Sequence, residues 1–428
     1  MMSITLPERF QVLHNRNFRL FFTGQFISLT GTWMQGFAGA WVVLRLTDST
    51  FALAVVNFAV AIPGLLLMLY GGMIADRRDR RRILVYTQAA QMALAFVAGV
   101  LVATGLIEFW QIVAISFALG IAQAFNMPAE QALVPSLVEP RQIPQAIALN
   151  QVIFNGSRLF GPAVAGVAVA TLGLASAYFA NGISYVAVLI SLVMIRVATR
   201  GPARAMPGSA IGAIREGLRY VWEKPLLRSL MGMNASTSLF VFPCLAVLSP
   251  AYVRDALHAG PGTSAVLIAG SGAASLIGAF VLLWVPARRR GETILGCIVM
   301  QGLSLAVMWA TTDAVVATVA FSALSFGMGL VFGLNATTVQ QVTPDAIRGR
   351  VMSVSGMMFS GVMPFATIAV GGLVEVAGVS RAYLLCGVLY ALAATVFLLR
   401  SGLVGRPPEA LVVTAEAHAA APAAAAGD

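Results

Sequence analysis

The sequence predicts an all-α polytopic membrane protein with twelve transmembrane helices in two pseudo-symmetric six-helix halves. Its 428 residues are 59% hydrophobic and only 10% charged, with a mean hydropathy of +0.85, whereas soluble domains carry about 25% charged residues. Apolar runs long enough to cross a bilayer recur along the chain, and a weak internal repeat divides it. Runs such as 51–70 are apolar on every face, which favours helices over the alternating strands of a barrel.

Each predicted span is an apolar run bounded by charges or turn residues, and about 20 apolar residues cross about 30 Å of hydrocarbon. The first six spans lie near residues 18–44, 50–75, 83–104, 109–128, 145–170 and 175–197. The second six lie near residues 228–253, 261–285, 292–311, 314–338, 349–375 and 378–400.

The chain is expected to divide into five parts. In chain order these are a cytoplasmic N-terminal segment (1–17), a first half (18–197), a cytoplasmic linker (198–227), a second half (228–400) and a disordered cytoplasmic tail (401–428). In the linker, Ile211, Ile214, Leu218 and Val221 recur at spacings of three and four. This pattern predicts an amphipathic helix on the inner membrane surface.

The basic residues set the orientation. Of the 27 lysines and arginines, three fall on the outer side, one, Arg158, falls within a span, and the rest gather on the other side. Because Lys and Arg concentrate in cytoplasmic loops, we expect a bacterial inner-membrane protein with both termini in the cytoplasm. No cleaved signal peptide is expected. The net charge of +10 is thus explained by topology and anionic lipid, and no nucleic-acid partner is expected.

The two halves share a diverged pattern of polar and proline residues. Asn335 follows Asn126 by 209 positions, and Pro364 follows Pro162 by 202. Parallel halves around a central site are typical of transporters.

The loop after the second predicted span carries the most specific local motif. It contains a glycine, three residues, an aspartate and a basic cluster, as Gly72, Asp76 and then residues 77–82. This resembles the signature loop of the major facilitator superfamily, although Asp79 stands where that family has a glycine. Physically, Gly72 would let two helices approach closely, and Asp76 would accept hydrogen bonds at a helix N-terminus.

Further stretches resemble the branch of that superfamily that exports enterobactin and macrolides. They are residues 125–135, 146–150 and 158–162, with the sequences FNMPAEQALVP, AIALN and RLFGP. The resemblance covers residues 10–400 and implies export of an amphipathic compound by alternating access, in exchange for protons. It also implies a monomer in the lipid bilayer without a cofactor.

The resemblance implies a cytoplasmic gate built from the loop aspartate and the start of the eleventh span. The gate candidates are Gly72, Asp76, Arg77, Arg80, Arg81, Glu130, Arg348 and Arg350. We expect Asp76 to cap the eleventh span or to pair with Arg350 when the inner face is closed. We expect Glu130 to pair with Arg80 or Arg81. The alternative is a set of surface salt bridges worth about 0–1 kcal/mol each.

Polar and aromatic residues on the inward faces of the spans are candidates to line a substrate cavity, because an unpartnered polar group facing lipid is costly. They are Gln25, Thr32, Trp33, Gln123, Gln151, Asn155, Arg158, Asn234, Phe242 and Asn335. The alternative is ordinary interhelical hydrogen bonding. Arg158 stands out because an arginine deep in a span costs about 2.5–3.5 kcal/mol.

Proton coupling has little sequence signal, because all 17 acidic residues lie in connectors or near span ends. A carboxylate buried in the span core is the usual proton carrier. Glu375 is the first candidate for that role and Glu108 the second.

Other chemistry has no matching motif. The chain lacks the G-x-x-x-x-G-K-[ST] loop that holds ATP phosphates and the motifs of hydrolases, so we expect no enzyme and no ATP-driven pump. Its three cysteines lie in predicted spans without paired spacing, so we expect no metal site. Two alternatives to export stay open: import of a small nutrient, and a sensor or lipid-handling role on the same fold.

Overall fold

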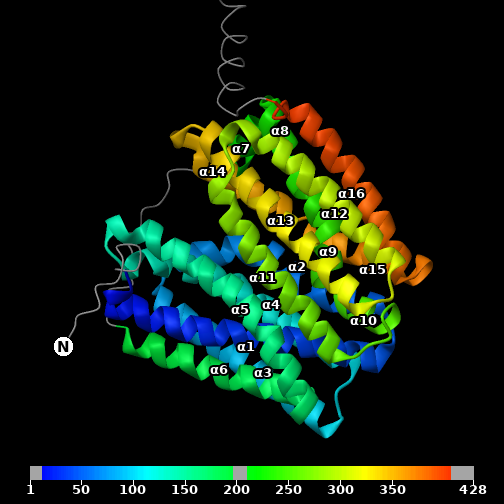
Figure 1. Ribbon diagram of the computed structural model, residues 1–428. Coiled ribbons are helices and arrows are strands. Elements are labelled where there is room, and N and C mark those ends of the chain that lie inside the picture. Colours follow the sequence, from blue (N-terminus) through cyan, green and yellow to red (C-terminus); the bar gives the residue numbers. More distant parts are fainter. Residues whose placement is uncertain (1–11, 196–209, 406–428) are drawn as a thin grey trace, which may run out of the picture. The chain divides into compact units, whose positions relative to one another are not determined.

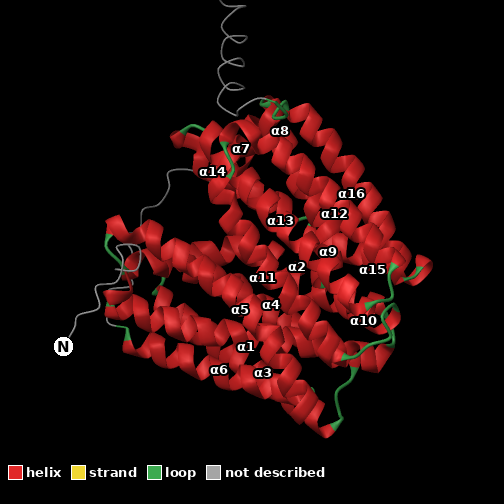
Figure 2. Cartoon of the chain, viewed as in Figure 1, coloured by secondary structure: helices red, strands yellow, loops and turns green. Residues whose placement is uncertain are grey.

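The computed structural model describes residues 12–195 and 210–405, and every regular element in these ranges is a helix (Figure 1, Figure 2). Expectations for residues 1–11, 196–209 and 406–428, including most of the predicted disordered tail, lie outside the described residues. Contacts divide the chain into two units. The first comprises residues 1–206 and 258–272, and the second comprises residues 207–257 and 273–428.

The first unit contains one helix for each of the first six predicted spans. These are α1 (Arg16–Thr47), α2 (Thr50–Arg77), α3 (Arg80–Thr104), α4 (Phe109–Leu133), α5 (Ile143–Leu172) and α6 (Ala175–Met194). Two short helices, η2 (Val134–Leu137) and η3 (Pro140–Gln142), connect α4 to α5. α1 packs against α5 and α6, and α4 packs against α2 and α3. The first part of α11 (Pro261–Val281) joins this unit, where Gly272 lies against Leu159 of α5.

The second unit begins with the helix predicted in the linker, α7. Its helices are α7 (Ala210–Glu223), α8 (Pro225–Ser236), η4 (Thr237–Val241), α9 (Phe242–Ala246), α10 (Ser249–Asp255), the end of α11, η5 (Leu282–Trp284), η6 (Ala287–Arg289), α12 (Arg290–Ala310), α13 (Ala314–Val342), α14 (Asp345–Ser360), α15 (Met363–Ala377) and α16 (Val379–Ser401). α12 packs against α13 and α16, and α7 packs against α14.

Eleven helical segments in the described ranges are long and apolar enough to cross a membrane. The helix at the first predicted span, α1, is not among them, although its 32 residues exceed the length that a span requires. Its buried side chains include Gln25 and Ser28, and polar residues of this kind lower its hydropathy. α1 therefore has the length of a span but a more polar composition than the other eleven segments.

The span predicted at 228–253 is a broken helix. After α8 the chain makes the π-helical turn η4, and the short helices α9 and α10 follow, each with a proline in its first turn. A proline is tolerated there because the first amides of a helix need no intrahelical partner. Apolar composition gives no warning of such a turn, because the residues around it stay hydrophobic.

The span predicted at 349–375 is also broken, between α14 and α15. Pro364 has no N–H to donate to the carbonyl group four residues earlier, so the regular ladder of hydrogen bonds is interrupted. Near this break, the hydroxyl of Ser238 in η4 donates to the carbonyl oxygen of Phe359 at 2.6 Å. The two irregular segments of the second unit are thus joined to each other.

α2 and α4 approach closely at two glycines. A Cβ atom on Gly71 would overlap the carbonyl oxygen of Ala124, and one on Gly120 would overlap backbone atoms of α2. Gly72, in contrast, has no described atom within 4 Å of its Cβ position. The close helix approach that the sequence predicts at Gly72 is therefore made by Gly71, because Gly71 faces α4.

Arginine side chains bind helix C-termini in both units. Arg80 donates to the carbonyl oxygen of Ala132 near the end of α4 at 3.0 Å, and Arg81 donates to that of Val193 near the end of α6 at 2.7 Å. In the second unit, Arg348 donates to carbonyl groups near the end of α13. A cation at this position is favoured by the helix dipole and satisfies terminal carbonyl groups. These arginines therefore stabilise helix ends.

A buried tyrosine joins three helices of the first unit. The Tyr185 hydroxyl on α6 donates to Gln91 on α3 at 3.0 Å. It also lies 3.3 Å from the hydroxyl of Thr32 on α1.

The second unit repeats this cluster. Tyr390 on α16 lies 2.7 Å from the amide group of Gln301 on α12, and Thr237 at the end of α8 contacts it. Tyr390 follows Tyr185 by 205 positions, and Gln301 follows Gln91 by 210. The pseudo-symmetry of the halves thus extends to individual buried hydrogen bonds.

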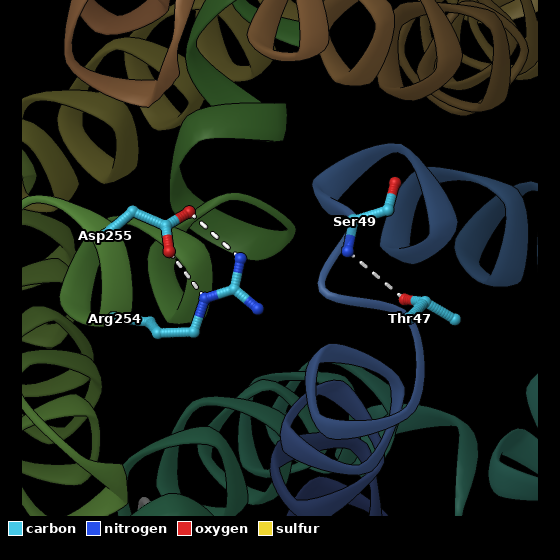
Figure 3. Close-up of polar contacts among 4 residues, drawn as sticks. All are labelled: Thr47, Ser49, Arg254 and Asp255. Carbon is cyan, nitrogen blue, oxygen red and sulfur yellow. Dashed lines mark hydrogen bonds and ion pairs between the residues drawn. The ribbon is translucent and has the colours of Figure 1, made fainter.

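Two local contacts, both drawn in Figure 3, lie at helix ends that the predicted topology places on the outer side of the membrane. In the first unit, the hydroxyl of Thr47 accepts from the amide of Ser49 at 3.3 Å, just before α2 begins. In the second unit, Arg254 donates to the carboxylate of its neighbour Asp255 at the end of α10. Each contact is confined to its own unit.

The packing of α2 on α4 gives a matched pair of substitutions. Gly71→Ala should lower the thermal unfolding midpoint of the purified protein, because overpacking costs about 1–3 kcal/mol. Gly72→Ala should leave it unchanged or raise it slightly. The midpoint in detergent, followed by differential scanning fluorimetry, checks both, and equal effects of the two substitutions would contradict this packing.

Candidate functional site

The predicted gate residues of the first unit lie at helix ends and are held locally. Arg80 and Arg81, at the start of α3, donate to the carbonyl groups described above. Arg77 is exposed, and the side chain of Asp76 lies outside the described residues. The expected contact of Asp76 with the eleventh span therefore stays a prediction.

The predicted gate residues of the second unit lie at the start of α14, in the predicted eleventh span, and contact neighbouring elements. Arg348 folds back onto the end of α13, where its Nε donates to the carbonyl oxygen of Gln340 at 3.0 Å. Arg350 of α14 forms an ion pair with Glu216 of α7. A Cβ atom on Gly217 would lie 2.9 Å from the carbonyl oxygen of Arg350. In this structure the partner of Arg350 is therefore a carboxylate of the linker helix.

Glu130 lies inside a membrane-spanning segment and forms no ion pair within the described ranges. α4 continues through Pro128, and the whole apolar segment runs to Leu137, whereas the sequence predicted an end near residue 128. The expected pairing with Arg80 or Arg81 is absent, because both guanidinium groups donate to helix-end carbonyl groups instead.

Glu130 belongs to a network of polar side chains from three helices. Its Oε2 lies 3.5 Å from Nδ2 of Asn126, one turn earlier on α4, and Gln25 of α1 contacts the carboxyl group. Oδ1 of Asn126 accepts from the Thr87 hydroxyl at 2.9 Å and from Nε2 of Gln88 at 3.2 Å, both on α3. Hydropathy does not predict this network, although the spacing of four between Asn126 and Glu130 places both side chains on one face of a helix.

The candidate cavity residues of the second unit bind one another. Nδ2 of Asn335 on α13 donates to Oδ1 of Asn234 on α8 at 2.9 Å, and Asn234 donates to the hydroxyl of Ser355 on α14 at 3.1 Å. Phe242 packs edge-on against Phe359, with ring centroids 5.4 Å apart. The two asparagines therefore tie three helices of this unit together.

The candidate cavity residues of the first unit are less connected. Gln25 is buried, Thr32 and Gln123 are exposed, and the side chains of Gln151 and Asn155 lie outside the described residues. Arg158 is half-buried near the middle of α5 and has no hydrogen bond or ion pair with any described residue. An unpaired guanidinium group at this depth is costly.

Two aromatic side chains of α5 that are close to Arg158 in the sequence pack against rings of α1. Phe154, one turn before it, packs edge-on against Trp33 with ring centroids 5.9 Å apart. Phe160, two residues after it, packs edge-on against Phe26 at 6.2 Å. The indole N–H of Trp33 is buried without a hydrogen-bond partner in the described ranges. The interface of α1 and α5 therefore combines aromatic side chains with an unpartnered indole N–H, and α5 also carries the unpaired Arg158.

The two candidates for proton coupling are exposed. Glu108 is the N-cap of α4, where it forms a capping box with Gln111 and accepts from the indole of Trp110. Glu375 is exposed near the end of α15. Neither carboxylate is therefore buried as a proton carrier in a span core was expected to be. In the part of the chain that the structure describes, no three His, Cys, Asp or Glu side chains gather in a way that could hold a metal ion.

Comparison with known proteins gives consistent matches over nearly the whole chain. The family described as "Transmembrane secretion effector" matches residues 8–425. The multidrug efflux pump Tap of Mycolicibacterium fortuitum is 24% identical over 359 residues, which cover 80% of this chain and 86% of that protein. Macrolide efflux protein A of Streptococcus pyogenes is 23% identical over 382 residues, which cover 87% and 93%.

A solved structure shares the fold. The crystal structure of the nucleoside transporter NupG matches with a TM-score of 0.74 and 11% identity, over 90% of this chain and 100% of that one.

The lack of a partner for Arg158 predicts an unusual effect on stability. Arg158→Met should leave the thermal midpoint unchanged or raise it, because it removes an unpaired charge from a span. Arg80→Met, the control, should lower stability by about 1 kcal/mol, because it removes a cation from a helix C-terminus. Scanning fluorimetry in detergent checks both, and a loss of stability in the Arg158 variant equal to that of the control would identify Arg158 as a structural residue.

Proposed function

Because the chain belongs to the transmembrane secretion effector family of major facilitator superfamily transporters, we propose that it exports an amphipathic small molecule by alternating access and proton antiport. Members of this superfamily move small molecules across membranes and are not enzymes. The substrate is a siderophore, a macrolide-like drug or a metabolite of similar chemistry. The protein acts as a monomer in the bacterial inner membrane, with both termini in the cytoplasm.

One observation supports an amphipathic substrate most directly, namely the unpaired Arg158 on a helix whose aromatic side chains Phe154 and Phe160 pack against α1. An arginine in a span costs about 2.5–3.5 kcal/mol unless something compensates its charge. A ligand with a largely apolar body and one anionic or hydrogen-bond-accepting group would stack on the rings and satisfy the guanidinium group. The unpartnered indole N–H of Trp33 would supply a second donor.

Import of a small polar nutrient is the less favoured alternative. Such a ligand needs many polar contacts to replace its water. In the second unit the large amides of Asn234 and Asn335 already bind each other, which leaves few side chains for that purpose. The relatives compared above are named as efflux proteins, which also supports outward transport.

The proposed function is tested by the accumulation of named compounds in cells that express the protein. A panel with a macrolide and a hydroxamate siderophore should include at least one compound whose accumulation falls several-fold, and a protonophore should restore it. Membrane insertion is verified on the same cells. No effect on any compound, with the protein inserted, would count against export, and higher accumulation would indicate import.

Arg158 gives the sharpest variant for that assay. Arg158→Ala should abolish most of the export, by about tenfold or more, because the transported compound loses its charged contact. Arg158→Lys should retain part of it, because lysine keeps the charge without the planar fork. Arg215→Ala, on the exposed side of α7, is the control and should export normally. Export by the Arg158→Ala variant at the wild-type rate would remove this residue from the site.

A further inference from the structure

The network around Glu130 contains a membrane-embedded carboxyl group without a counter-ion in the described ranges. The charged residues on the helices packed against α4 are Arg16, Arg19 and Arg45 on α1, Asp76 and Arg77 on α2, and Arg80, Arg81 and Arg82 on α3. Arg16, Arg45 and Arg82 are exposed. Arg19 and Arg77 are exposed, and Arg80 and Arg81 donate to carbonyl groups. The side chain of Asp76 lies outside the described residues.

The polar partners of Glu130 suit a group that changes its protonation state. The ionised carboxylate accepts from donors such as Nδ2 of Asn126, whereas the protonated form would donate one hydrogen bond. Amide groups such as that of Gln25 can serve both forms, because they carry a donor and an acceptor. Gln88 is only 3% exposed, and its Oε1 has no partner in the described ranges. The network therefore contains an acceptor, Oε1 of Gln88, that can still accept a hydrogen bond.

The internal repeat provides a comparison for this network. Arg80 is the first residue of α3, and Arg290 is the first residue of α12, 210 positions later. Arg80 donates to a carbonyl group near the end of α4, and Arg290 donates to the side chain of Gln341 near the end of α13. The offset of 210 also relates Gln91 to Gln301, which bind the repeated tyrosines. α3 and α12 are therefore aligned by two independent pairs.

The same alignment shows that the carboxyl group and the α3 donors of this network are absent from the second half, although Asn335 and Asn234, the counterparts of Asn126 and Gln25, bind each other there. The counterparts of Thr87 and Gln88 are Cys297 and Ile298, and the counterpart of Glu130, at the Asn126–Asn335 offset of 209, is Val339. These three residues are buried, at 5%, 1% and 0% exposure. A six-helix half thus packs these three positions with apolar side chains, so the carboxyl group of Glu130 and its α3 neighbours are not a requirement of the fold.

We propose that Glu130 binds the proton that is exchanged for substrate, and that Asn126, Thr87, Gln88 and Gln25 position its carboxyl group. The proposal rests on the export proposed above and assigns its proton site. The proton moves between water and a carboxylate oxygen, with no other bond made or broken. Protonation removes the need for donors around Glu130 and so changes the contact between α4 and α1, the helix that carries Trp33.

Glu130→Gln tests this assignment, because glutamine keeps the size of the side chain and cannot release a proton. In proteoliposomes with a compound exported by the wild type, uptake driven by a pH gradient should fall about tenfold or more. Exchange of labelled for unlabelled compound at equal pH should stay within about twofold of wild type, since exchange needs no net proton movement. Glu139→Gln, an exposed carboxylate near the same helix end, should behave as wild type in both assays.

Each other outcome has a definite meaning. Gradient-driven transport by Glu130→Gln at the wild-type rate overturns the assignment, and Glu375→Gln and Glu108→Gln are then compared in the same assay. Loss of exchange together with gradient-driven transport also overturns it, because a structural role would affect both. Absence of any flux in the wild type, in contrast, overturns the export function itself.

Discussion

A polar group inside hydrocarbon needs a partner, and most of this structure follows from that requirement. Backbone groups satisfy it by forming helices. Buried side chains satisfy it with the repeated tyrosine clusters around Tyr185 and Tyr390 and with the pair of Asn234 and Asn335. At helix ends, arginines bind the terminal carbonyl groups. Residues that depart from the rule, such as Arg158, are therefore the ones whose presence the fold alone does not explain.

The internal repeat separates what folding needs from what function adds. Features that appear in both halves, such as the tyrosine clusters and the arginines at the starts of α3 and α12, hold a six-helix unit together. Features that appear once, such as the unpaired Arg158 and the buried carboxyl group of Glu130, have no structural counterpart that requires them. Both single features lie in the first unit, so the proposed substrate contact and the proposed proton site share one half of the protein.

The sequence predicted the helices well and their irregularities poorly. Hydropathy located the spans because burial in lipid demands long apolar runs. It could not locate the π-helical turn at η4 or the break between α14 and α15, since neither changes the apolar character of the chain. The sequence predicts that the fourth span ends near Pro128, which places Glu130 in a connector. In the structure α4 continues past Pro128 and includes Glu130. Which of two adjacent glycines faces a neighbouring helix depended on the rotation of α2, which favoured Gly71 over Gly72.

The central claim is that substrate and protons move in opposite directions through this protein. The most direct test measures both together, with proteoliposomes that contain a trapped pH-sensitive dye and no initial pH gradient. Substrate added outside and entering through the wild-type protein should make the lumen more alkaline, because protons leave as substrate enters. Acidification of the lumen would show that protons accompany the substrate, and substrate entry without any change in pH would show that no proton is exchanged. Either result would contradict the account.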